Sequence, residues 1–176
     1  MTRTNLASAL TASAAAALMI ALAPTAEAGA LKAQIYFVQA AIPKQLTEKS
    51  LIAFGRRNAA RLLRETNDAE VKTRKWKAEM IVTFNKPVDD MEFQMLFYDI
   101  HEGPRRFLND MAMMVNDRSQ KTFVQKVTLP RPQFKPNRQM ELVVTVRREE
   151  VGRVKFAVVG QEIQRSGEVS FSDTER

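Results

Sequence analysis

The sequence predicts a mainly β protein, an antiparallel sandwich of about seven strands with one possible amphipathic helix near its N-terminus. Two observations carry this prediction. Apolar residues alternate with other residues over 76–84 and 91–97, and again over 140–146 and 154–158, which is the period of a strand with one buried face. Turn-forming Pro, Gly, Asn and Asp separate these stretches at near-regular intervals, as they do in sandwiches of short strands.

Residues 1–28 have the features of a secretory signal peptide that is cleaved from the mature chain. Arg3 precedes an apolar, Ala-rich run, and small residues follow up to an A-x-A pattern at 26–28, which is typical of a cleavage site. An uncleaved membrane anchor is the alternative, but the Ala and Ser content makes this run weakly hydrophobic for a permanent span. We therefore expect an exported protein, either periplasmic or extracellular.

A single domain is expected over residues 29–172. The chain contains no cysteine, so the fold has no disulfide, and thiol nucleophiles and cysteine metal sites are excluded. The net charge is +7, and residues 1–28 contribute one arginine and one glutamate, so their removal leaves it unchanged. A basic protein of this kind favours anionic partners.

The first part of the domain combines a strand with an amphipathic segment. Residues 31–39 alternate as a strand does. Over residues 47–66, leucines and small residues recur every three or four positions, with arginines on the other side, which predicts a helix. Gly55 stands in the middle of that run and weakens a helix, so a pair of short strands turning at 57–58 remains the alternative.

We expect the core to form around residues 76–100. The alternation there predicts two strands joined by a tight turn at 85–90, with Met91 on the apolar face of the second strand. This pair contains Trp76, the only tryptophan, and several of the largest apolar side chains, which dominate core energetics. The predicted core comprises Trp76, Met80, Val82, Phe84, Phe93, Met95, Phe97, Leu142, Val144, Val146, Phe156 and Val158.

The rest of the chain continues the pattern of strands and turns. Further strands are expected at residues 105–115, 123–129, 140–146 and 154–158, with a short edge strand at 167–172 and a flexible tail at 173–176. A loop over 130–138 contains three prolines. Because proline has no N–H to donate to a strand ladder, we expect a stiff loop outside any sheet.

Recurrent strands at this spacing resemble the immunoglobulin-like sandwich in architecture, although the cysteine pair of true immunoglobulin domains is absent. A second resemblance rests on a string of residues spread along the domain. The string is Trp76-x-Ala78, Phe84-Asn85-x-Pro87-Val88, Phe97-Tyr98-Asp99 and Phe134-Lys135-Pro136-Asn137. It is similar to that of a group of small secreted bacterial proteins of uncharacterised function. Its members are packing and turn residues, so the resemblance implies no activity.

Few residues offer catalytic or metal-binding chemistry. His101 is the only histidine, so a Ser-His-Asp site would need it together with Asp99, and no G-x-S-x-G elbow is present. A metal site built on two histidines is excluded for the same reason. Methionines at 111–114 could suit Cu(I), but methionines elsewhere occupy strand faces as ordinary core residues. We therefore expect no enzyme activity, metal or cofactor.

Consecutive antiparallel strands reverse direction, so successive loops alternate between the two ends of a sandwich. One end gathers the loops at 86–90, 116–120 and 148–152. Its acids, which could form an oxygen cage for Ca²⁺, are Asp89, Asp90, Asp117, Glu149 and Glu150. Its cations are Lys86, Arg118, Arg148 and Arg153. Because the two sets nearly balance, salt bridges are favoured over a calcium site.

The other end gathers the turn at 101–104, the proline loop and the entry to the Trp76 strand with Arg74 and Lys75, and it is basic. Between residues 118 and 148, eight basic residues face a single acid. Arginine can form two parallel hydrogen bonds with a phosphate or carboxylate, and the acids expected nearby are Glu102 and Glu162. The predicted anion-binding residues are Arg105, Arg106, Arg131, Lys135 and Arg138. Lys72 falls in a polar loop outside this group.

The sequence therefore favours a non-catalytic, exported binding or interaction module of the cell envelope. Its basic end is expected to bind an anionic envelope polymer or a partner protein, whereas nucleic acid is less available in that compartment. Two alternatives remain. One is a structural envelope component that pairs through its sheet edges, and the other is a hydrolase or metal-dependent enzyme whose site the sequence does not reveal.

The mature chain is predicted to begin at or near Gly29, because the A-x-A pattern ends one residue before it. Mass spectrometry of the exported protein measures this directly. A mass that still includes residues 1–28 would contradict the prediction.

Overall fold

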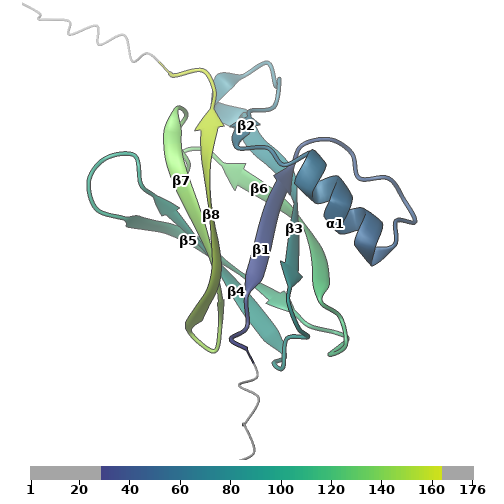
Figure 1. The fold of residues 1–176 in the computed structure, drawn as a ribbon. Helices are drawn as coiled ribbons and strands as arrows, with labels where there is room; N and C mark the ends of the chain where they lie inside the picture. The colour runs from purple at the N-terminus through teal and green to yellow at the C-terminus, as the bar shows by residue number, and fades with distance from the viewer. Residues whose placement is uncertain (1–28, 164–176) are drawn as a thin grey trace, which may run out of the picture.

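The computed structural model describes residues 29–163, which form two β-sheets packed face to face (Figure 1). β1 (Ala33–Val38), β3 (Lys75–Phe84) and β6 (Thr122–Pro130) form an antiparallel sheet in the order β1-β3-β6. The second sheet, in the order β2-β8-β7-β4-β5, contains β2 (Leu62–Arg64), β8 (Glu149–Val159), β7 (Arg138–Val146), β4 (Glu92–Asp99) and β5 (Arg106–Met114). β2 runs parallel to β8, and the other pairs are antiparallel. The predicted mainly β fold is confirmed.

The core lies between the two sheets and is built from alternate residues of their strands. Every side chain of the predicted core is buried, and Trp76 has no exposed surface. Edge-to-face contacts join the sheets: the ring centroids of Phe84 and Phe93 are 5.2 Å apart, and those of Phe93 and Phe123 are also 5.2 Å apart. Such contacts add to the free energy of apolar burial. The predicted core is therefore confirmed.

The prediction that residues 76–100 form two strands joined as a hairpin is wrong. β3 pairs with β1 and β6, whereas β4 pairs with β5 and β7, so the segment between β3 and β4 crosses from one sheet to the other. Met91 also differs from the prediction, because it precedes β4 and its side chain is 62% exposed. Alternation shows which face of a strand is buried, but it does not show which sheet the strand joins, since both inner faces of a sandwich are apolar.

Residues 47–66 contain the predicted helix, and the alternative pair of short strands turning at 57–58 is wrong, because the helix continues to Arg57. A helix, α1 (Glu48–Arg57), is followed by the short strand β2. Thr47 caps the helix: its Oγ1 accepts a hydrogen bond from the N–H of Ser50 at 3.3 Å, an arrangement that satisfies a free donor of the first turn.

Gly55 is the point where α1 touches the three-stranded sheet. It is buried, and a Cβ atom at this position would lie 3.0 Å from Ile81 Cδ1 and 3.3 Å from Tyr36 Cδ2. The glycine that weakens the helix in isolation therefore lets it approach the sheet closely. α1 lies on the outer face of that sheet (Figure 1).

The other predicted strands within the described residues coincide with β1, β5, β6, β7 and β8. β6 continues to Pro130, so this proline ends a strand instead of lying in the loop, and it is tolerated because β6 is at a sheet edge. The predicted signal peptide at 1–28, edge strand at 167–172 and tail at 173–176 lie outside the described residues. No helix within residues 29–163 is long and apolar enough to cross a membrane.

Trp76→Ala is predicted to lower the free energy of unfolding by about 3–5 kcal/mol, because the enclosed ring would leave a cavity. Denaturant titration measures the loss. Val124→Ala is the control, since Val124 is 41% exposed on β6, and it should cost less than about 1 kcal/mol. A similarly small loss for Trp76→Ala would contradict the burial of the ring.

Candidate functional site

The five cations predicted to bind an anion lie at one end of the sandwich. Arg138, at the start of β7, forms an ion pair with Glu102 in the turn between β4 and β5, with Nη1 and Oε1 2.9 Å apart. In the proline loop, Gln133 Nε2 donates a hydrogen bond to the carbonyl oxygen of Leu108 in β5 at 2.7 Å. The 101–104 turn and the 130–138 loop are therefore neighbours, as the alternation of loops predicts.

Four of these five cations are paired with acids of the chain itself. The pairs are Arg105–Glu141 (2.5 Å), Arg106–Asp99 (3.3 Å), Arg131–Glu65 (2.5 Å) and Arg138–Glu102 (2.9 Å). Glu102 is one of the two acids expected nearby, whereas Glu65, Asp99 and Glu141 are additional acids that the sequence does not indicate. The additional acids come from β4, from β7 and from the residue that follows β2, so an inventory of loop charges misses them.

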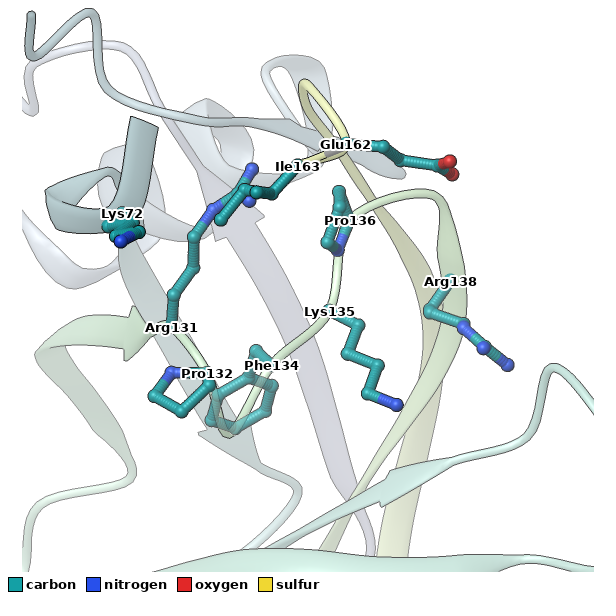
Figure 2. A pocket seen from close by; sticks show the side chains of 9 residues that line it. All are labelled: Lys72, Arg131, Pro132, Phe134, Lys135, Pro136, Arg138, Glu162 and Ile163. Carbon is teal, nitrogen blue, oxygen red and sulfur yellow. The ribbon is translucent and has the colours of Figure 1, made fainter. Parts of the chain in front are cut away.

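A pocket of about 860 Å³ lies beside the proline loop (Figure 2). It is lined by Lys72, Arg131, Pro132, Phe134, Lys135, Pro136, Arg138, Glu162 and Ile163. Phe134 has no exposed surface and fixes the loop to the core through an edge-to-face contact with Phe97, whose ring centroid is 6.0 Å away. The loop that forms one wall of the pocket is therefore held in place by the core. The lining of the pocket contains four cations and one acid.

The two lysines of the pocket differ from its two arginines. Neither Lys72 nor Lys135 takes part in an ion pair within residues 29–163. Figure 2 shows them on either side of Arg131. Lys72 belongs to a short 3₁₀ turn, η1 (Val71–Thr73). The sequence places it outside the predicted anion-binding group, and its position in the lining of the pocket corrects that prediction. These two ammonium groups are the charges that remain available to an anion.

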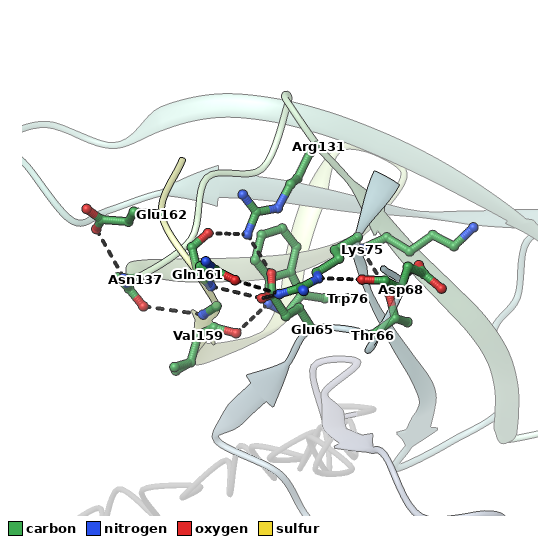
Figure 3. A network of polar contacts seen from close by, with 12 residues as sticks. Glu65, Thr66, Asp68, Lys75, Trp76, Arg131, Asn137, Val159, Gln161 and Glu162 are labelled. Atoms are coloured by element: carbon green, nitrogen blue, oxygen red, sulfur yellow. Dashed lines mark hydrogen bonds and ion pairs between the residues drawn. The ribbon is translucent and has the colours of Figure 1, made fainter. Parts of the chain in front are cut away.

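Arg131 belongs to a partly buried polar cluster behind the pocket (Figure 3). Its side chain is 6% exposed, and Nη2 lies 2.5 Å from Glu65 Oε2 and 2.7 Å from the carbonyl oxygen of Gln161. The guanidinium carbon lies 5.3 Å from the centre of the Trp76 ring, a cation–π contact. We call Glu65, Arg74, Trp76, Arg131 and Gln161 the Glu65 cluster.

The Glu65 cluster joins four segments that are distant in sequence. Glu65 Oε1 accepts hydrogen bonds from Arg74 Nη1 at 3.1 Å and from the backbone N–H of Gln161 at 2.9 Å. Trp76 Nε1 donates to the carbonyl oxygen of Val159 at 2.9 Å. The end of β2, the start of β3, the end of β6 and the segment after β8 therefore meet around one carboxylate.

The electrostatics of the cluster favour a charged Glu65. Burial on its own would raise the pKa of Glu65, but hydrogen bonds from the Gln161 N–H, from Arg131 and from Arg74 outweigh it and lower the pKa below its usual 4.5. Arg131 is consequently occupied by an internal carboxylate. It shapes the wall of the pocket instead of offering its charge to a ligand.

Three of the five acids at the opposite end, Asp89, Asp90 and Glu150, form salt bridges, two of them with Arg147, which is not among the expected cations. Asp117 and Glu149 form no salt bridge within residues 29–163. Arg147 Nε lies 3.2 Å from Asp90 Oδ2, and Arg153 Nε lies 2.5 Å from Glu150 Oε1. In the part of the chain that the structure describes, no three His, Asp or Glu side chains are grouped as a metal site requires. The calcium alternative therefore has no geometric support.

His101 and Asp99 form a turn whose geometry differs from that of a catalytic pair. The backbone N–H of His101 donates to Asp99 Oδ1 at 2.9 Å, and Asp99 Oδ2 lies 3.3 Å from Arg106 Nη2. Both carboxylate oxygens are therefore engaged with groups other than the imidazole, whereas a triad needs the carboxylate to orient the ring.

Three of the methionines expected on strand faces, Met80, Met95 and Met140, are buried core residues.

No match to the chain is found among protein-family models, curated proteins or solved structures. Its function is therefore inferred from the pocket and the charges around it. This arrangement is suited to binding, because it places two lysines, which form no ion pair within residues 29–163, beside a loop that Phe134 anchors to the core.

The Glu65 cluster predicts a specific acid dependence of stability. Because the folded pKa of Glu65 is lowered, its contribution is present above the unfolded value of 4.5 and is lost as pH falls through the folded value. Glu65→Gln should be less stable at neutral pH by about 1–3 kcal/mol and should show a smaller loss between neutral pH and acid. Denaturant titrations across this pH range measure both effects.

Glu70→Gln is the matched control for this prediction, because Glu70 is exposed and its side chain makes no capping hydrogen bond at η1. It should leave both the stability and its pH dependence almost unchanged. Identical pH profiles for Glu65→Gln and the unaltered protein would show that the folded pKa of Glu65 is not lowered.

Proposed function

We propose that the chain is an exported, non-catalytic binding module whose basic pocket binds an anionic ligand of the cell envelope. The observation that carries the proposal is the position of Lys72 and Lys135, two lysines that line one pocket and form no ion pair in the described part of the chain. Exposed like charges repel each other and are screened by salt, so they contribute little to the stability of a fold. An external anion accounts for their juxtaposition better than stability does.

The chemistry of the pocket favours phosphate or carboxylate groups on a lipid headgroup or an acidic glycan. An ammonium group binds such anions as a point charge, and the prolines of the 130–138 loop reduce the conformational entropy that the loop would lose on binding. Envelope polymers carry these groups in large numbers. Export is proposed from the signal-like residues 1–28, which lie outside the described part of the chain.

The strand order supports an immunoglobulin-like arrangement for this module. In variable-type immunoglobulin domains, one sheet holds strands A, B, E and D, while the other holds G, F, C, C′ and C″. In the first sheet, β1, β3 and β6 correspond to strands A, B and E. In the second sheet, β8, β7, β4 and β5 correspond to strands G, F, C and C′. The two sheets formed by residues 29–163 contain no counterpart of D or C″. The helix α1 and the absence of the inter-sheet disulfide depart from that pattern.

A structural role through sheet-edge pairing is a second candidate, and one observation favours it. β5 is an edge strand, and exposed apolar side chains lie on it or beside it: Met91 is 62% exposed, Phe107 53% and Met114 57%. An exposed apolar edge strand can pair with a strand of another chain. A concentration-dependent increase in mass, measured by light scattering and abolished by Met114→Lys, would favour this candidate.

The proposed function predicts that Lys72→Glu combined with Lys135→Glu weakens polyanion binding by about tenfold or more, because two attractive contacts become repulsive. The probe is lipopolysaccharide, with a sulfated glycan as a second polyanion. Affinity is measured by titration calorimetry at low and at high salt. Binding by the unaltered protein should weaken as salt rises.

Lys32→Glu combined with Lys49→Glu is the matched control, because it changes the net charge equally at two exposed lysines outside the pocket. Equal loss in both double variants would mean that binding reflects diffuse net charge, and the pocket proposal would fail. Arg131 is unsuitable for charge reversal. A second acid beside Glu65 would break the Glu65 cluster and lower stability, because a buried charge would lose its partner.

A further inference from the structure

The outer edge of β8 is covered along only part of its length. β8 extends over Glu149–Val159, but β2 pairs with the last three residues, 157–159. β7 occupies the other side of β8 along most of its length. Near the beginning of β8, a Cβ atom at Gly152 would lie 2.5 Å from the carbonyl oxygen of Ala33 of β1. β1 also packs on the inner face of β8 farther along, where the ring centroids of Phe37 and Phe156 are 4.6 Å apart, but its backbone pairs with β3 and not with β8. Residues 153–156 lie between Gly152 and the residues that pair with β2.

The backbone of this gap has a defined direction. The N–H of Ala157 donates to the carbonyl oxygen of Arg61 at 2.8 Å, so the backbone groups of Ala157 point away from β7. Polar backbone groups alternate in direction along a strand, so those of Arg153 and Lys155 point to the same open side. Within the described residues, no strand pairs with them there.

A hollow of about 520 Å³ coincides with this gap. Its lining includes three cations, Arg61, Arg153 and Lys155. Arg153 is bound to Glu150 at 2.5 Å, whereas Arg61 and Lys155 take part in no ion pair within residues 29–163. The edge therefore combines unpaired backbone groups with positive charge.

This combination selects one kind of occupant. A second copy of the same edge would place cations opposite cations, which is unfavourable in a strand pair. A neutral strand would gain backbone hydrogen bonds only, whereas an acidic strand would gain those bonds and the attraction of Arg61 and Lys155. Four residues of strand span about 13 Å, so the gap accommodates a short extended segment.

We propose that the edge of β8 at residues 153–156 binds an extended acidic segment of a partner protein as an added strand. The backbone of the segment pairs with Arg153 and Lys155, in line with β2. Its acidic side chains lie on the outer face beside Lys155, and the intervening apolar side chains face the core side, where Phe156 is buried. This surface is separate from the pocket beside the proline loop, since the two linings share no residue.

The test uses a fluorescent peptide of about eight alternating Glu and Val residues and follows its anisotropy as the domain is added. We expect saturable binding, and a loss of about tenfold or more with Arg61→Glu combined with Lys155→Glu. Lys32→Glu combined with Lys49→Glu changes the net charge equally and should weaken binding much less. Absence of binding to the acidic peptide, or equal loss in the two double variants, would overturn the proposal.

A second form of the peptide separates strand addition from simple charge attraction. Methylation of alternate backbone nitrogens along one edge removes the donors that pair with β8 and keeps every charge. We expect this form to lose binding, and we expect hydrogen exchange at the Lys155 amide to slow when the unmethylated peptide is bound. Equal affinity of the two forms would show that backbone pairing plays no part and would overturn strand addition at this edge.

Discussion

The ion pair between Glu65 and Arg131 is the interaction on which the arrangement of this end of the sandwich depends. Removing two charges from water costs several kcal/mol each, and the pair repays that cost only if further hydrogen bonds satisfy the remaining atoms. Glu65 receives them from Arg74 and from the Gln161 N–H. Arg131 Nη2 also donates to the Gln161 carbonyl, and the Trp76 ring lies against the guanidinium, although Arg131 Nε has no partner within the described residues. Glu65 follows β2 of the five-stranded sheet, whereas Arg131 follows β6 of the three-stranded sheet. The ion pair therefore connects the two sheets and holds them in one relative position.

This constraint changes which charges can serve a ligand. The arginines at the basic end look like an anion site in sequence, but a planar guanidinium is also the side chain best suited to a buried carboxylate. Arg105 and Arg131 are both used in that way, by Glu141 and Glu65, whose side chains are 3% and 12% exposed. The lysines, which are strongly hydrated point charges, stay at the surface. Counting cations therefore overstates the free charge of this end, and the ion pairs identify Lys72 and Lys135 instead.

Local patterns predict the strands and the core well, because alternation depends only on which face of the strand each residue occupies. Residues 140–146 are an example: their alternation is visible without knowing which strands pair with β7. Pairing could not be predicted in the same way. β3 and β4 are adjacent in sequence yet lie in different sheets, and the residues between them contain no signal for that crossing. The partners of the basic end were missed for the same reason: Glu65 and Arg131 are 66 residues apart. The sequence predicts that Gly55 weakens the helix, because its contact Ile81 lies in a different element, β3, and a local pattern does not show contacts between elements.

Both proposed binding surfaces depend on where β2 begins and ends. The Gln39 side chain exchanges hydrogen bonds with the backbone N–H and carbonyl of Arg64, each at 2.9 Å, which fixes the end of β2 and directs Glu65 into its cluster. At the other end of β2, the N–H of Ala60 donates to the Phe37 carbonyl at 2.7 Å, so the chain turns toward the opposite sheet before it can cover more of β8. A longer β2 would pair with residues 153–156 and close the gap. The strand is thus long enough to place Glu65 behind the pocket and short enough to leave an edge of β8 open.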